Sequence, residues 1–340
     1  MKIGTKRAAW AALIAGVAAG VYAGYPFARF MYGWQTNGPP ALHRLPVSAP
    51  TAQLRYGPSP QQVADLRMPT GKGPFPIAVV IHGGCFLAKV DDKGGIAPVA
   101  DALTKHGIAT LNIEYRKLGD AGAGWPNTYR DIGTAVDLVR DIARTYPVDL
   151  HRVTFVGHSS GAHYALWAAS RPKLPTTSAI RGADPFKPAA VVGIDGPPAL
   201  APFVGRDSEE CGEPVIVPLI GGTPAQVPER YREIDTGARL PLGMRQGFVV
   251  AQLGETMTGY IARAKAAGDP VSVYTPKQPY HFRIVNPERE EGRRTLQLIE
   301  SLARSAYRPH RRRVKFGDDR ARAAVYTRGL RSTAPGTTRC

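Results

Sequence analysis

The chain has 340 residues, enough for one large domain or two ordinary ones, which excludes a small disulfide scaffold. Its 37 glycines and 31 prolines make up one fifth of the residues, below the level typical of low-complexity sequence, and 43% hydrophobic residues can fill a core. The formal net charge of +17 raises the question of a nucleic-acid or membrane partner, so the distribution of the charge matters.

The amino terminus carries an export or membrane-insertion signal, predicted over residues 1–30. An uncharged run at 8–28 follows the basic residues Lys2, Lys6 and Arg7. A basic flank stays cytoplasmic, so we expect the rest of the chain in the periplasm or outside the cell. Two fates stay open. The pattern Val21-Tyr22-Ala23 is compatible with signal-peptidase cleavage, whereas the run is also long enough to remain as a membrane anchor.

Two further segments are predicted to flank the folded domain, a linker at 31–62 and a basic, disordered tail at 308–340. Residues 304–340 contain eleven lysines and arginines against two aspartates, a net charge of +9 and about half of the total excess. No nucleic-acid reader motif accompanies these charges, so nucleic acid is not an expected partner.

The domain itself is predicted over 63–307, where short apolar runs alternate with longer amphipathic ones. This pattern favours an α/β fold with a mostly parallel central sheet and helices on both faces. The expected strands are 77–81, 108–115, 153–157, 190–194, 248–251 and 271–274. The expected helices are 96–106, 128–146, 160–170, 255–267 and 287–307. Residues 196–243 break the alternation and predict a cap-like insertion with one short helix at 228–234.

The strongest local motif is G-x-S-x-G, formed by Gly157, His158, Ser159, Ser160 and Gly161. An apolar strand precedes the motif and an amphipathic helix follows it. A sharp turn in that position exposes a serine hydroxyl at the end of a strand, which predicts Ser159 as a catalytic nucleophile. The alternative is an ordinary strand-to-helix turn with a capping serine, a role that Ser160 would fill as readily.

A second motif supports this interpretation. The strand at 77–81 ends in His82-Gly83-Gly84-Cys85, a glycine pair whose amides can approach a substrate carbonyl oxygen. Acyl transfer places negative charge on that oxygen, and fixed N–H donors stabilise it. We therefore predict an oxyanion hole formed by the backbone N–H groups of Gly84, Cys85 and Ser160.

A general base and an acid must complete such a site. His281 lies between the last predicted strand and the final helix, where a base is expected, whereas His82, His158 and His163 lie within the motifs and are expected to support them. The acid should follow the nucleophile in the chain, usually just past the penultimate strand. Glu255 is the first carboxylate there, and Asp195, at the end of the preceding strand, is the alternative.

The three cysteines, Cys85, Cys211 and Cys340, lack the spacing of a zinc site. In an exported protein, a Cys85–Cys211 disulfide is a reasonable hypothesis, and two buried thiols are the alternative. No metal or organic cofactor is expected.

The residues resemble the α/β-hydrolase superfamily, in particular its esterase/lipase and kynurenine-formamidase-like branch. That branch pairs an HGG-type loop with a G-H-S-x-G turn, found here at 82–86 and 157–163. The segments 112–116 and 125–131 are also similar to the region between those motifs. The resemblance covers about 74–307 and implies an α/β-hydrolase fold.

Residue by residue, the resemblance implies Ser159 as nucleophile, His281 as base and the region of Gly84 as oxyanion hole. One departure concerns the acid. Family members often carry a D-x-x-V-P-like segment after the penultimate strand, whereas this chain has Gln252-Leu-Gly-Glu255-Thr-Met.

The expected function is a serine hydrolase that cleaves carboxylic esters through an acyl-enzyme intermediate, with a small-molecule ester or amide as substrate. Two alternatives stay open. One is an amidase of the formamidase type. The other is a catalytically impaired hydrolase fold that acts as a binding protein, tethered to the membrane if the amino-terminal segment is retained.

Overall fold

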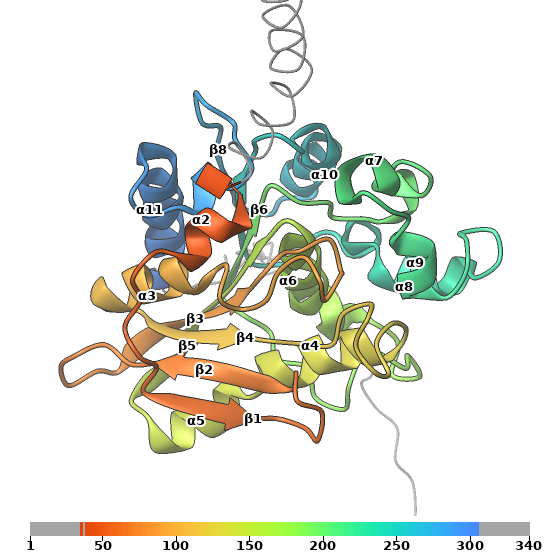
Figure 1. Cartoon of the computed structure of the whole chain (residues 1–340). Coiled ribbons are helices and arrows are strands. Elements are labelled where there is room, and N and C mark those ends of the chain that lie inside the picture. Colours follow the sequence, from red (N-terminus) through yellow and green to blue (C-terminus); the bar gives the residue numbers. More distant parts are fainter. Residues whose placement is uncertain (1–34, 37, 306–340) are drawn as a thin grey trace, which may run out of the picture. The chain divides into compact units, whose positions relative to one another are not determined.

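The computed structural model describes residues 35–36 and 38–305 (Figure 1). The predicted leader at 1–30 and basic tail at 308–340 lie outside these residues. Within the described ranges, none of the helices is long and apolar enough to cross a membrane.

A central sheet of eight strands organises the fold, in the order β1-β2-β4-β3-β5-β6-β7-β8. The first two strands are antiparallel to their neighbours, and all the remaining pairs are parallel. The strands are β1 (Ala52–Arg55), β2 (Val63–Arg67), β3 (Phe75–Ile81), β4 (Ala109–Ile113), β5 (Val148–His158), β6 (Ala190–Ile194), β7 (Arg245–Val249) and β8 (Val271–Tyr274). Because β3, β5, β6 and β7 are parallel, their carboxyl ends meet at one edge of the sheet, where functional groups can gather.

Helices cover both faces of this sheet (Figure 1). On one face, α3 (Ala97–Lys105) and α11 (Glu290–Arg304) pack on Val80 and Val156. On the other, the core around Phe155 is covered by α4 (Asn127–Asp137), α5 (Val139–Thr145), α6 (Ser160–Ser170) and α10 (Glu255–Ala266). Strands that are buried on both sides require the continuous apolar runs from which they were predicted. The predicted α/β-hydrolase fold class is confirmed.

The sheet begins earlier in the chain than the sequence indicates. All six predicted strands are present, but β1 and a short helix, α2 (Pro39–His43), lie within the predicted linker at 31–62. Strand β2 was not predicted from the sequence, because the buried charged residues Asp65 and Arg67 interrupt its apolar pattern. Asp65 pairs there with Lys93. The helix predicted at 128–146 is divided at Leu138 into α4 and α5.

The predicted insertion at 196–243 contains three short α-helices, α7 (Asp207–Cys211), α8 (Ile216–Ile220) and α9 (Pro228–Ile234), of which only the last was predicted. They lie on the same side of the molecule as α10 (Figure 1). The buried carboxylate of Asp207 accepts hydrogen bonds from the N–H groups of Val215 (2.7 Å) and Ile216 (2.8 Å), which joins α7 to α8. The insertion is therefore packed structure rather than an open loop.

Candidate active site

Ser159 occupies the turn between β5 and α6. Its backbone has φ 56° and ψ −125°, a conformation that non-glycine residues rarely adopt and that is concentrated at functional sites. The Ser159 N–H donates to the carbonyl of Ile194 at the end of β6 (2.9 Å), and its own carbonyl accepts the N–H of Ala162 (2.9 Å). The turn is therefore held from both sides, and it leaves Ser159 partly exposed at the edge of the sheet.

The glycines of this motif are required by close backbone contacts. A Cβ atom at Gly157 would lie 1.9 Å from the carbonyl oxygen of Gly161, and one at Gly161 would lie 2.2 Å from the carbonyl oxygen of Ile81. Neither backbone segment can give way cheaply. The glycines of the G-x-S-x-G motif are therefore required by packing, within the turn and against β3, as well as by the chemistry of the serine.

The glycine turn after β3 lies against the nucleophile. A Cβ atom at Gly83 would stand 2.8 Å from Cβ of Ser159. The next residues, Gly84 and Cys85, have φ 107° and 53°. Within the described part of the chain, the backbone N–H groups of Gly84, Cys85 and Ser160 donate no hydrogen bond. The three predicted oxyanion donors therefore come from two turns that meet at Ser159.

A buried polar network supports the glycine turn. His82 Nε2 lies 2.9 Å from Oε1 of Glu114, and Lys117 pairs with the same carboxylate. Glu114 also accepts the N–H groups of Tyr115 and Lys93, each at 2.9 Å. Although burial raises the pKa of Glu114, the neighbouring His82 and Lys117 outweigh it and lower the pKa below the ordinary value. A charged carboxylate thus anchors the start of the turn.

His281 and Asp195 form the hydrogen-bonded pair of the site. His281 Nδ1 donates to Oδ2 of Asp195 at 2.7 Å, and the Asp195 side chain is fully buried. The other carboxylate oxygen of Asp195 accepts the N–H groups of Ala251 (3.0 Å) and Leu253 (2.9 Å). With Nδ1 committed to Asp195, Nε2 is the nitrogen of His281 free to accept a proton.

The geometry favours the second of the two predicted acids. Glu255 begins α10 and is exposed, and it makes no hydrogen bond to His281 in the described residues. Asp195 follows β6 directly, and Ser159 follows β5, the neighbouring strand. The structure thus brings Ser159, Asp195 and His281 to one edge of the sheet. Among the described residues there is no hydrogen bond between Ser159 Oγ and His281, a bond that often tightens only when substrate binds.

His158 holds the loop that carries His281. Its Nε2–H donates to the carbonyl of His281 (2.9 Å), and the two rings lie 4.5 Å apart. Burial, reinforced by the nearby His281, lowers the pKa of His158 to about 3, so this imidazole is neutral and can serve as a fixed donor. The sequence places His158 inside the motif but gives no sign of this contact with a residue 123 positions away.

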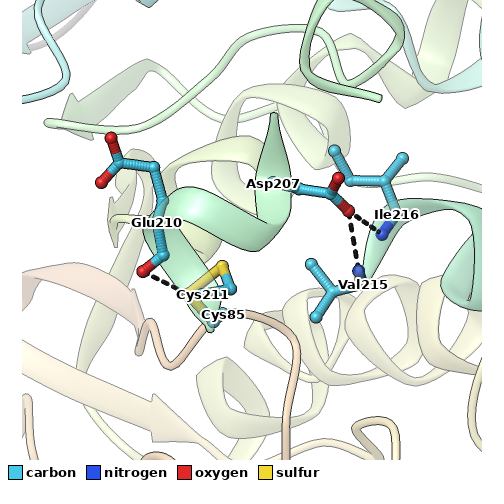
Figure 2. Close-up of a disulfide and its surroundings, with 6 residues drawn as sticks. All are labelled: Cys85, Asp207, Glu210, Cys211, Val215 and Ile216. Atoms are coloured by element: carbon cyan, nitrogen blue, oxygen red, sulfur yellow. Dashed lines mark hydrogen bonds between the residues drawn. A yellow bond between two sulfur atoms is a disulfide. The ribbon is translucent and has the colours of Figure 1, made fainter. Parts of the chain in front are cut away.

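The predicted disulfide between Cys85 and Cys211 is present, with the two Cα atoms 5.6 Å apart (Figure 2). It joins the glycine turn to the last residue of α7. The dashed line in Figure 2 from Cys85 Sγ to the carbonyl oxygen of Glu210 spans 4.0 Å. A disulfide sulfur carries no hydrogen, so this is a packing contact.

A cleft of about 280 Å³ lies near this region, and its lining includes residues next in the chain to groups of the site but not Ser159, Asp195 or His281 themselves. Its lining comes from parts of 198–203, 206–210 and 252–263. Leu253, which lines it, donates its N–H to Asp195, and Glu210, also in the lining, precedes the cysteine linked to Cys85. The cleft therefore lies between the segment that holds Asp195 and the helix that is linked to the oxyanion turn. Glu255 belongs to this lining.

One group of side chains has the composition of a metal site. His43, Asp91 and Asp92 offer ligand atoms within 4.8 Å of one another. These atoms are engaged with protein groups, because His43 Nε2 lies 2.7 Å from Asp91 Oδ1 and Asp92 Oδ1 accepts the N–H of Gly94 at 2.6 Å. Asp91 also packs on Gly84, so the hydrogen-bonded pair of His43 and Asp91 supports the glycine turn.

The fold and the arrangement of turns at this edge define an α/β-hydrolase. The chain belongs to the BD-FAE family, whose model matches residues 64–236. No curated protein sequence matches it.

Solved structures with the same fold include several hydrolases. A truncated carbohydrate esterase from gut microbiota superposes with a TM-score of 0.62 at 17% identity, covering 76% of this chain and 100% of that one. Esterase B from Lactobacillus rhamnosis gives 0.60 at 18% identity, with coverages of 84% and 96%. An acetyl ester-xyloside bifunctional hydrolase from Caldicellulosiruptor lactoaceticus gives 0.58 at 15% identity, with coverages of 76% and 97%.

Proposed function

We propose that the protein is a serine hydrolase that cleaves carboxylic esters, with Ser159 as nucleophile, His281 as general base and Asp195 as the acid. The observation that supports this assignment best is the 2.7 Å contact between His281 and Asp195, at the sheet edge that also bears the strained turn of Ser159. Of the two candidate acids, Asp195 is therefore chosen over Glu255.

The mechanism follows from these positions. His281 Nε2 takes the proton of Ser159 as Oγ attacks the ester carbonyl, and Asp195 stabilises the imidazolium that forms. The N–H groups of Gly84, Cys85 and Ser160 stabilise the oxyanion. His281 then gives the proton to the departing alcohol, which leaves an acyl-enzyme, and water releases the acid by the same steps in reverse.

The cleft favours a polar alcohol and a small or medium acyl group. Arg206 and Arg263 line it together with Glu209 and Glu255, and within the described residues none of these forms an ion pair. Exposed charges suit a hydroxyl-rich partner better than a long alkyl chain. Two of the structural neighbours are described as acting on carbohydrate esters or acetyl ester-xylosides, and esterase B has been solved with a tributyrin phosphonate, which agrees with this choice.

The test is hydrolysis of a p-nitrophenyl ester series from acetate to decanoate by the full chain, beside an acetylated xylo-oligosaccharide. Wild type and Glu255→Gln should hydrolyse the short esters, whereas Ser159→Ala and Asp195→Asn should not. An N-formyl amide in the same assay separates an esterase from an amidase of the formamidase type. A folded wild type that cleaves none of these substrates and leaves a fluorophosphonate probe unreacted would contradict the proposal and favour the binding-protein alternative.

We also propose that the catalytic domain acts outside the cytoplasm. The predicted leader at 1–30 and the Cys85–Cys211 disulfide both suit an oxidising compartment. Cell fractionation checks this directly, and recovery of the protein in the cytoplasmic fraction with both cysteines reduced would contradict it.

A further inference from the structure

We propose that Cys211 is a positioning residue for the oxyanion hole. Through its disulfide to Cys85, the insertion holds the glycine turn in the positive-φ conformation from which the N–H groups of Gly84 and Cys85 act on the oxyanion. The inference rests on the proposed ester hydrolysis and adds to it a residue 52 positions beyond the nucleophile.

The glycine turn needs to be held because its backbone is strained. Gly84, Cys85 and Phe86 have φ 107°, 53° and 63° in succession. Glycine adopts such values freely, but the two residues after it carry side chains that disfavour them. Strained conformations of this kind persist only where the surrounding structure enforces them.

Each residue of the turn has a different restraint. Gly84 packs on Asp91, and its carbonyl accepts the N–H of Leu87 at 2.9 Å. Phe86 is only 5% exposed and packs edge-on against Tyr164, with ring centroids 5.6 Å apart. Cys85, between them, is only partly buried, and the restraint on its side chain is the covalent bond to Cys211. The disulfide thus adds a covalent restraint to a strained residue that packing against the core buries only in part.

Cys211, at the other end of the disulfide, lies in a segment that is held in place by buried contacts. Cys211 ends α7, which begins at the buried Asp207 (Figure 2). The Asp207 carboxylate binds the N–H groups of Val215 and Ile216, and both of those side chains are buried in the core. The disulfide therefore links the turn to a segment that is fixed to the core.

This arrangement predicts an effect on the transition state more than on substrate binding. The oxyanion exists only during acyl transfer, so N–H groups that are misplaced lower kcat for every ester. A loss confined to KM would instead indicate that the link serves only the cleft wall formed by α7.

The first arm of the test compares variants of the full chain on p-nitrophenyl acetate. Cys211→Ser should lower kcat about tenfold or more while KM stays within about threefold, since losing one oxyanion donor costs roughly 100- to 1000-fold. Ser208→Ala, a change in the same helix that leaves the disulfide intact, should retain wild-type kcat. Ser159→Ala supplies the background rate. Melting curves confirm that each variant is folded.

The second arm uses folded wild-type protein and a dithiol reductant. Dithiothreitol closes to a cyclic disulfide and passes two electrons and two protons to the Cys85–Cys211 bond, which becomes two thiols. We expect the same fall in kcat, reversed when the reductant is replaced by oxidised glutathione. The Cys85→Ser/Cys211→Ser variant retains Cys340, so its indifference to reductant would show that the effect belongs to this bond.

The inference is overturned if kcat on acetate stays within threefold of wild type in Cys211→Ser, or if only KM changes. If Cys211→Ser does not fold, kcat and KM of the reduced but folded wild-type protein are judged by the same criterion. An active enzyme that depends on Ser159 but not on the disulfide contradicts the inference alone. A wild type without hydrolysis that depends on Ser159 contradicts the proposed function, and the inference with it.

Discussion

Asp195 Oδ2 lies 2.7 Å from Nδ1 of His281, although the two residues are 86 positions apart in the chain. The carboxylate is fully buried and is held by two backbone N–H groups of the loop after β7. A histidine oriented in this way has one tautomer and one ring orientation available.

The first prediction concerns this pair. Asp195→Asn should lower kcat for p-nitrophenyl acetate by about 10³- to 10⁴-fold, because the amide presents the wrong hydrogen-bonding partner to His281. Glu255→Gln should leave kcat within about threefold, since Glu255 does not contact the histidine. Steady-state kinetics on the two variants check this. A large loss of kcat in Glu255→Gln with a small one in Asp195→Asn would instead identify Glu255 as the acid.

The second prediction concerns Glu114, which anchors the glycine turn through His82. Glu114→Gln leaves buried His82 and Lys117 without their carboxylate and should lower the free energy of unfolding by about 3 kcal/mol at pH 7. Because the folded pKa of Glu114 is below its ordinary value of 4.5, its stabilising effect is present above that pH and fades as the pH falls below it.

Urea denaturation at pH 7 and pH 4 measures both effects of Glu114→Gln. The matched control is Asp141→Asn, which removes an exposed ion pair with Arg144 and should cost less than about 1 kcal/mol. Equal losses in the two variants would contradict an anchoring role for Glu114.

The third prediction concerns pH and two buried histidines. Burial lowers the pKa of His158 and of His163 to about 3, from an ordinary value of 6.5. Between these values the unfolded chain binds protons that the folded chain does not, so stability falls as the pH drops below 6.5 and the fall continues to about pH 3. Each histidine should contribute a slope of about 1.4 kcal/mol per pH unit near pH 5.

His163→Gln tests this slope by urea denaturation between pH 4.5 and 5.5. The variant should lack the contribution of one histidine to the slope of unfolding free energy against pH. Tyr129→Phe deletes the 2.9 Å hydrogen bond to His163 Nε2 without removing the titrating group. It should therefore lower stability by a similar amount at every pH in this range. An unchanged slope in His163→Gln would show that this histidine is protonated in the folded protein.

Local signals explain why much of the site could be predicted from the sequence. Ser159 and the glycine turn lie directly after apolar strands, and the parallel sheet brings the ends of those strands together. His281 follows the last strand for the same reason. The candidate acid is different, because a carboxylate follows each of the strands β6 and β7. The path of the His281 loop decides between Asp195 and Glu255, and no local pattern describes that path.

Contacts between distant segments explain why Glu114 and strand β2 could not be predicted from the sequence. Glu114 looks like an ordinary charged residue after a strand, and only the fold places it on His82. Strand β2 carries Asp65 inside the protein, where Lys93 and Gln53 satisfy its charge and hydrogen bonds. A buried ion pair removes the apolar alternation on which strand prediction depends.

The last prediction concerns the turn of Ser159. Gly157→Ala should abolish activity and destabilise the fold, because the new Cβ would lie 1.9 Å from the carbonyl oxygen of Gly161, far inside contact distance. Gly259→Ala in α10 is the matched control, since its Cβ would meet only the Arg263 guanidinium at 3.9 Å. That change should raise stability by about 0.5 to 1 kcal/mol through helix propensity. Melting curves and reaction with a fluorophosphonate distinguish the two variants, and a folded, reactive Gly157→Ala would show that the start of α6 can move away from β5.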